Sequence, residues 1–299
     1  MTIGEKIKKM RSEKFLTQSE LAGEKITRNM LSLIEKDRAV PSLQTLMYLA
    51  EKLKVSPGFL LADEEETAFF LKADKMSEIR LAFKKQNFRI CLDLCKRLIA
   101  DAGADDELSL LAAECSLGAA KEEFFADRVR NACELFDDAV LYAADTEYYT
   151  GHIKLSVKLY FRYLEELSPS FASENAYDEE WNLRGYIPFE DEFCQYLMAL
   201  EAVGQQDDGM INCYLERTTD RDMLLAKHIK ALQYMNHGEY EMAANCLNDI
   251  LRSDETVPGT VLYYVFGNLE ECCRRLENRR SAKLFAEART SQFERLLST

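Results

Sequence analysis

The sequence TQSELAGEKITRNMLSLIEKDRAVPSLQTL, residues 17–46, decides the fold of the N-terminal part of the chain. Thr17 is followed three residues later by Glu20, which is the pattern of a capping box at the start of a short helix. Thr27 is a second N-cap residue and predicts a helix over about 28–36. The stretch therefore predicts two short helices that are joined by a tight turn.

The sequence on either side of this stretch supplies three more helices. Ile3, Ile7 and Met10 recur at helical spacing, which predicts a first helix with one apolar face and lysines on the other. Ser42 is a cap for a fourth helix, and Ser56-Pro57 begins a short fifth one. The expected core residues of the three helices that follow the first are Leu21, Ala22, Leu31, Ile34, Leu43, Leu46, Leu49, Ala50 and Leu53.

This layout resembles the Cro/C1-type (XRE) family of helix-turn-helix proteins over residues 3–62. The matching residues are Thr17-Gln18, Glu20-Leu21-Ala22, ITRNMLSLIE at 26–35, Pro41-Ser42-Leu43, Leu46 and Leu60-Leu61. In this family the second helix of the motif enters the major groove of double-stranded DNA. The resemblance therefore implies a sequence-specific DNA-binding domain, for which we expect residues 1–63.

The resemblance also implies which side chains read DNA. Arg28 and Asn29 would contact bases, because Arg pairs with guanine O6/N7 and Asn with adenine N6/N7. Ser32 and Leu33 lie one turn further on, and Leu33 either touches a thymine methyl group or packs within the domain. The remaining expected interface residues, which include candidate phosphate contacts, are Thr17, Gln18, Thr27, Lys36 and Arg38. An ion pair between Arg11 and Glu35 is expected to be structural.

Charge is divided unevenly along the chain. The net charge is -14, yet residues 1–62 hold 11 Lys/Arg against 7 Asp/Glu. A basic head on an acidic body can bind phosphate at one end while the body repels it, or the acidic body only keeps the protein soluble. The acidic run at 63–66 is either a domain boundary or the first turn of the next helix.

The remainder, residues 64–299, reads as one helix after another. The clearest unit is 224–255, which resembles a tetratricopeptide repeat through Ala231, Gly238, Tyr240 and further small and apolar residues. Weaker matches to the same repeat pattern lie at 87–98, 132–139 and 282–286. The stretch 168–190 shows the least regular spacing of apolar residues. We expect an all-α chain, in which a five-helix DNA-binding domain precedes an α-solenoid of helical hairpins.

A helix-turn-helix head on such a body resembles the Rgg/PlcR-like regulators. That resemblance implies a homodimeric, cytoplasmic transcription regulator, used in quorum sensing, that binds a short signalling peptide in the repeat groove. The side chains expected in the groove are His228, Met235, Asn236, Tyr264 and Asn268. The alternative is a DNA-binding regulator whose repeats bind a partner protein instead.

Other functional classes find little support. The chain has no Gly-rich phosphate loop, no Ser/His/Asp or Cys/His arrangement and no metal-ligand spacing, so we expect no enzyme, cofactor or metal. Its apolar stretches are too short to span a membrane. The nine cysteines are interpreted as reduced and mostly buried, with a redox pair at Cys91 and Cys95 as the alternative. Exposed apolar residues of the last helix, namely Phe293, Leu296 and Leu297, are candidates for a dimer contact.

Overall fold

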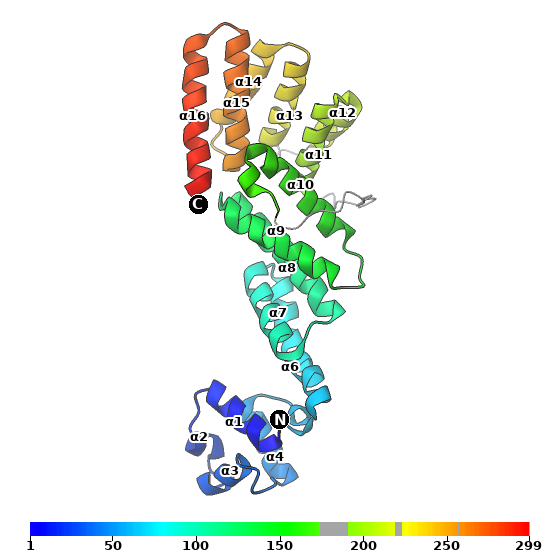
Figure 1. Ribbon diagram of the computed structural model, residues 1–299, viewed down its shortest axis with the longest axis vertical. Coiled ribbons are helices and arrows are strands. Elements are labelled where there is room, and N and C mark those ends of the chain that lie inside the picture. The colour runs from blue at the N-terminus through cyan, green and yellow to red at the C-terminus, as the bar shows by residue number, and fades with distance from the viewer. Residues whose placement is uncertain (174–190, 219–222, 256, 299) are drawn as a thin grey trace. The chain divides into compact units, whose positions relative to one another are not determined.

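The computed structural model describes residues 1–173, 191–218, 223–255 and 257–298 (Figure 1). Throughout these ranges the regular structure is helical, which confirms the all-α prediction. Contacts divide the chain into two compact units, Met1–Leu108 and Ser109–Thr299. Each unit is described by itself below.

The first unit begins with the five predicted helices, which cluster around one core. They are α1 (Ile3–Glu13), α2 (Gln18–Ala22), α3 (Arg28–Ile34), α4 (Leu43–Leu53) and α5 (Pro57–Leu61). The side chains of Thr17, Thr27, Ser42 and Ser56 each accept a backbone N–H bond at the start of a helix, so the predicted caps are confirmed. Gly23 turns the chain between α2 and α3 with a φ of 56°.

Helices α1 to α5 are called the head below. The core of the head follows the predicted pattern with two exceptions. Leu21, Leu31, Ile34 and their predicted partners on α4 are buried together, but Leu43 is 68% exposed, so its place in the core was predicted wrongly. Leu43 is the first residue of α4, where the helix has only begun to cover the core.

Lys6 is the second exception, because it does not lie on a solvated lysine face. Its side chain is only 2% exposed, and its Nζ donates to the carbonyls of Phe59 (3.0 Å) and Ala62 (2.6 Å) and to the Thr67 hydroxyl (3.0 Å). A buried ammonium is tolerated only where such acceptors replace water. Lys6 therefore ties α1 to the end of α5 and to the helix that follows.

That following helix, α6 (Glu64–Lys84), begins at the acidic run. The Asp63 side chain accepts from Glu66 N at 2.8 Å, so the run is the start of a helix. Phe70 and Leu71 of α6 pack against the core of the head, and α7 (Phe88–Ala102) forms a hairpin with α6. The first compact unit thus extends past the division at residue 63, which stays a prediction of where the DNA-binding domain ends.

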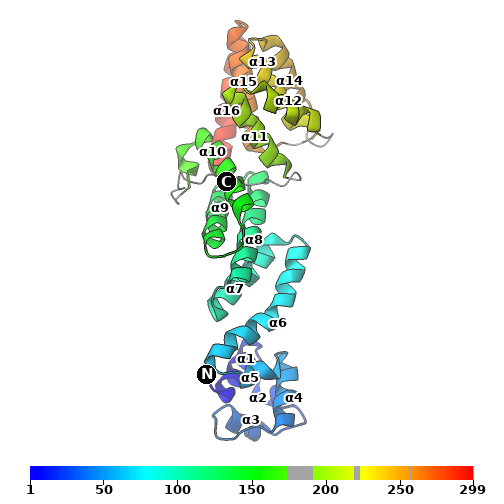
Figure 2. The same cartoon turned by 90° about the vertical axis from the view of Figure 1, so that its right-hand side faces the viewer.

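The second unit consists of stacked helices. They are α8 (Asp106–Phe125, whose first residues belong to the first unit), α9 (Val129–Ala144), α10 (Gly151–Leu167), η1 (Pro169–Phe171), α11 (Glu192–Gln205), α12 (Asp208–Arg217), α13 (Met223–Asn236), α14 (Tyr240–Leu251), α15 (Gly259–Arg275) and α16 (Arg279–Ser298). Helices α13 to α16 lie side by side in both views (Figures 1 and 2). The repeat-like hairpins that the sequence predicts are confirmed.

Five hairpins in the described part of the chain share one turn geometry. They join α6 to α7, α8 to α9, α11 to α12, α13 to α14 and α15 to α16. In each turn the residue two positions before the second helix has a positive φ; these residues are Gln86, Asp127, Gln206, Gly238 and Glu277. The next amide donates to the carbonyl five positions earlier, as in Glu239 N to Tyr234 O at 2.8 Å. This hydrogen bond is that of a Schellman motif, so the repeats share a turn even where their sequences differ.

Asp127 also makes contacts outside its own turn. Its Oδ1 accepts from Gly259 N at 2.6 Å, at the start of α15, and its other oxygen accepts from Arg295 of α16. The residue before Gly259 is Pro258, which gives the helix no side-chain cap. A carboxylate from the α8–α9 turn therefore caps α15 and fastens the last hairpin within the second unit.

Four further predictions can be compared with the structure. Leu296 is 0% exposed, Phe293 packs against Tyr263 with tilted rings at 5.7 Å between centroids, and Leu297 is half-buried, so the expectation of an exposed apolar end of α16 was wrong. None of the nine cysteines, all of which lie in the described ranges, forms a disulfide, and Cys91 and Cys95 are fully buried. Most of the irregular stretch 168–190 lies outside the described residues. Within the described ranges, no helix is long and apolar enough to cross a membrane.

Candidate functional site

The α3 helix presents one face to the core and the other to solvent. Leu31 and Ile34 are buried, whereas Arg28, Asn29 and Leu33 are exposed. At about 100° per residue, Arg28, Asn29 and Leu33 fall on one arc of the helix, opposite the buried pair. Ser32 lies on the same arc and is half-buried. Four of the expected base-reading residues therefore share one outward face.

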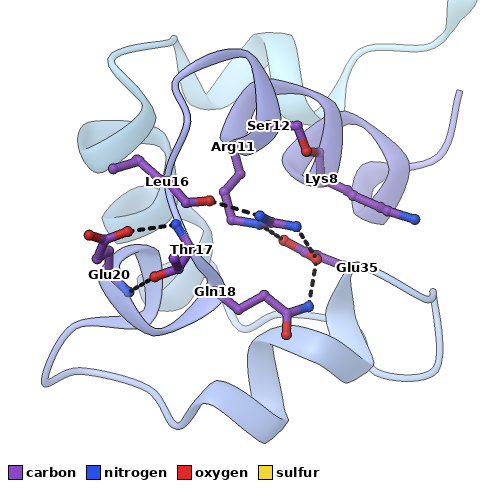
Figure 3. A network of polar contacts seen from close by, with 8 residues as sticks. All are labelled: Lys8, Arg11, Ser12, Leu16, Thr17, Gln18, Glu20 and Glu35. Atoms are coloured by element: carbon purple, nitrogen blue, oxygen red, sulfur yellow. Dashed lines mark hydrogen bonds and ion pairs between the residues drawn. The ribbon is translucent and has the colours of Figure 1, made fainter.

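A polar network fixes this helix against the rest of the head (Figure 3). The Arg11 guanidinium donates to both oxygens of Glu35, from Nε at 2.6 Å and from Nη2 at 3.1 Å, and its Nη1 donates to Leu16 O at 2.8 Å. The predicted ion pair is thus confirmed, and its hydrogen bond raises the pKa of Arg11. Because α3 ends beside Glu35, the pair holds the helix at a fixed angle to α1.

Gln18 belongs to the same network. Its Nε2 donates to Glu35 Oε2 at 2.8 Å, so one side of the amide is used inside the protein (Figure 3). The side chain is half-buried. Thr17 and Thr27 use their hydroxyls to cap α2 and α3 by accepting from Glu20 N and Met30 N. These three residues position the two helices of the motif, whatever they contact besides.

The segment after α3 carries the two expected phosphate partners. Lys36 and Arg38 are exposed, and neither makes an ion pair with a described residue. Asp37 between them has a φ of 53°, a left-handed conformation that is uncommon for a non-glycine residue. Its carboxylate accepts from Thr2 Oγ1 at 2.6 Å and from Gly4 N at 3.1 Å, which offsets the backbone cost. Asp37 was not foreseen as a link between this segment and the start of α1.

The second unit contains a cavity of about 850 Å³. It is lined by residues of α10, α11, α13 and α15. Its apolar lining consists mainly of leucines, and its polar lining includes Arg162, Glu165, Glu166, Glu201, His228, Tyr264 and Asn268. A volume of this size lies within the range of about 300–1,000 Å³ that is usual for small-ligand sites.

His228 anchors a hydrogen-bonded chain at this cavity. The ring is 1% exposed, and burial lowers its pKa to about 4, so the imidazole is neutral at pH 7. Its Nε2 accepts from Asn268 Nδ2 at 2.9 Å, which leaves Nδ1 to donate to the Tyr196 hydroxyl at 2.7 Å. The Asn268 amide is thereby held in one orientation, with its oxygen not engaged by this bond.

The structure brings together only part of the predicted groove. His228, Tyr264 and Asn268 line the cavity, whereas Met235 and Asn236 do not. The Asn236 amide instead donates to Val203 O at 3.1 Å and joins α13 to α11. The lining residues of α10 and α11 escaped prediction because these helices carry no repeat motif and the α11–α12 turn holds Gln206 in place of glycine.

Comparisons with known proteins support a helix-turn-helix domain in the N-terminal part of the chain. The family model of a helix-turn-helix domain matches residues 4–83. The immunity repressor protein of Bacillus phage phi105 is 35% identical over 98 residues, which are 29% of this chain and 68% of the repressor.

Solved structures also align with most of the chain. PlcR of Bacillus thuringiensis, solved with the peptide PapR7 and DNA, aligns over 100% of this chain and 99% of its own, at 12% identity and a TM-score of 0.27. The apo competence regulator ComR of Streptococcus vestibularis aligns over 97% of both chains, at 16% identity and a TM-score of 0.26. The phage repressor is matched over two thirds of its length, and on that ground the chain belongs to the Cro/C1-type (XRE) helix-turn-helix family of DNA-binding regulators.

Proposed function

We propose that the chain is a homodimeric, cytoplasmic transcription regulator that reads its operator with α3 and is controlled by a short peptide bound in the cavity of the second unit. The observation that carries the DNA-reading part is the outward face of α3, on which Arg28 and Asn29 are exposed while Leu31 and Ile34 are buried. The observation that carries the peptide part is the cavity of about 850 Å³.

The proposed division of work on DNA follows the chemistry of the side chains. Arg28 and Asn29 read base edges in the major groove, and Leu33, which is 42% exposed, meets a thymine methyl group. Lys36 and Arg38 bind phosphates. Thr17, Gln18 and Thr27 hold the motif in place, and Ser32 lies beside the base readers. In a homodimer, two such helices meet half-sites about 34–36 Å apart on one face of the duplex.

The ligand is proposed to be a peptide instead of a folded partner protein because the binding space is a partly open pocket between four helices, of a size that suits a short chain segment. Its apolar lining suits side chains of a short peptide, and the oriented Asn268 amide and the Tyr264 ring suit a peptide backbone. A folded protein would need a broad surface, in general about 800 Å² on each partner.

Genome-wide DNA footprinting, with and without conditioned medium, tests both parts. The proposal expects protected sites with two-fold symmetry whose occupancy changes when the medium contains secreted peptides. Protected sites without symmetry would count against the homodimer, and occupancy that is indifferent to any medium or peptide extract would count against peptide control. A pull-down that returns one protein in stoichiometric amount would favour the partner-protein alternative.

A further inference from the structure

The cavity of the second unit carries more negative than positive charge. Three carboxylates line it, those of Glu165, Glu166 and Glu201, against one guanidinium, that of Arg162. Arg162 Nη1 donates to Glu201 Oε1 at 2.6 Å, so these two charges meet each other. Glu165 and Glu166 are exposed and make no ion pair with a described residue, so water and not a protein cation offsets these two negative charges.

Glu166 lies close to the tyrosines that line the cavity. The Tyr264 hydroxyl donates to Tyr163 O at 3.0 Å, and both tyrosines line the cavity. Burial raises the pKa of Tyr264, and the nearby Glu166 carboxylate raises it further because it disfavours a second negative charge. The excess of carboxylates along the lining favours cations over anions, and solvent screens this preference because Glu165 and Glu166 are exposed.

From this charge complementarity we infer that the cavity selects peptides that carry a positive charge, either a lysine or arginine side chain or a free α-amino group, beside apolar residues. The inference rests on the proposed peptide-binding function and specifies its ligand. A cation placed against Glu165 and Glu166 compensates the two carboxylates, while the leucines of the lining accept the apolar side chains. An acidic peptide would add repulsion at the same wall.

Affinity selection with synthetic hexapeptide pools tests the inference. In each pool, five positions carry random combinations of Leu, Phe, Tyr and Ala, and one position carries a residue that is fixed for that pool. All peptides are C-terminally amidated. Four pools are compared: N-acetylated with lysine, N-acetylated with glutamine, N-acetylated with glutamate, and free amino terminus with glutamine. The full-length protein is passed through a desalting column with each pool, and retained peptides are quantified by mass spectrometry. The lysine and free-amine pools separate the two sources of charge.

The expected result is that at least one cationic pool is retained about tenfold better than the neutral pool, and the glutamate pool least. This preference should disappear in the E165Q/E166Q double variant and persist in E216Q/E294Q, which removes the same charge from exposed positions outside the cavity. Retention without regard to charge, a preference for glutamate, or a preference that survives E165Q/E166Q would overturn the charge selection while peptide binding stands. Retention of no pool would overturn the peptide-binding function together with the inference.

Discussion

Lys6 is a charged side chain that acts as part of the core of the head. Its ammonium satisfies two carbonyls at the end of α5 and the Thr67 hydroxyl. The periodicity of α1 assigned it to a solvated face, because sequence spacing gives a side chain's direction and not the acceptors that await it. The ammonium also lies near the C-terminal end of α5, where the negative end of the helix dipole stabilises a cation.

Replacing Lys6 should therefore cost far more than replacing its neighbour Lys9, which is exposed. In Lys6→Met the Phe59 and Ala62 carbonyls lose a buried donor, and we expect a loss of about 1–3 kcal/mol in the stability of the head. Urea denaturation monitored by hydrogen exchange of α1 to α5 measures it. Equal stabilities of Lys6→Met and Lys9→Met would contradict the assigned role.

His228 gives the second unit a defined response to acid. Its pKa of about 4 in the folded chain lies below the ordinary 6.5. Between these values the unfolded chain binds the proton that the folded chain refuses, so the free energy of unfolding falls as the pH drops from 6.5 to 4. The effect amounts to at most about 3 kcal/mol and is absent above pH 7.

The comparison of wild type with His228→Gln isolates this term from the carboxylates, which titrate in both. Glutamine can still donate and accept hydrogen bonds but does not titrate. We expect a shallower loss of stability between pH 6.5 and 4 in the variant, measured by urea unfolding. Parallel pH profiles of the two proteins would show that the histidine is not held neutral.

Among the elements, the helical hairpins explain why the repeats are hard to recognise in the sequence. Only Gly238 is a glycine among the five turn residues with positive φ, and the unit that contains it is the clearest one in the sequence. The other four turns hold Gln, Asp, Gln and Glu, which adopt the same conformation at some cost. A glycine signal therefore identifies one hairpin of five.

The two glycines Gly238 and Gly204 should respond in opposite ways to the same added methyl group. A Cβ would meet nothing within 4 Å at either position, so packing is not involved. Gly238 has a φ of 79°, and Gly238→Ala should cost about 1 kcal/mol, whereas Gly204 lies within α11 and Gly204→Ala should gain up to about 1 kcal/mol. Thermal unfolding should show shifts of about 2–4 °C in opposite directions. Shifts of one sign would mean that the turn geometry is wrong.

How far the sequence predicts each part follows from the range of the interactions. The head is built from caps and periodic apolar residues within about one turn of each other, so Thr17, Thr27, Ser42 and Ser56 already mark its helices. The cavity draws its lining from α10, α11, α13 and α15, which are far apart in the chain. The contact of Asp127 with Gly259 spans 132 positions and leaves no local pattern.

At the scale of the whole molecule, basic residues of the N-terminal domain that neutralise phosphates should make DNA binding dependent on salt. Each phosphate that is neutralised contributes about -0.9 to the slope of log affinity against log salt. Replacing both Lys36 and Arg38 by alanine should lower affinity on every sequence alike and make the slope shallower by about two. Fluorescence anisotropy from 50 to 300 mM salt measures the slope. A slope that is unchanged in this variant would exclude both residues from phosphate contact.

The double variant R28A/N29A tests most directly whether the outward face of α3 reads the operator. Its affinity for the footprinted operator is compared by anisotropy with that of wild type and of Lys52→Ala, an exposed lysine on α4. Each base pairing is worth about 1–3 kcal/mol, so the double variant should bind the operator at least tenfold more weakly and lose its preference over scrambled DNA, while Lys52→Ala retains it. Unchanged operator affinity and preference in a folded R28A/N29A protein would contradict the account.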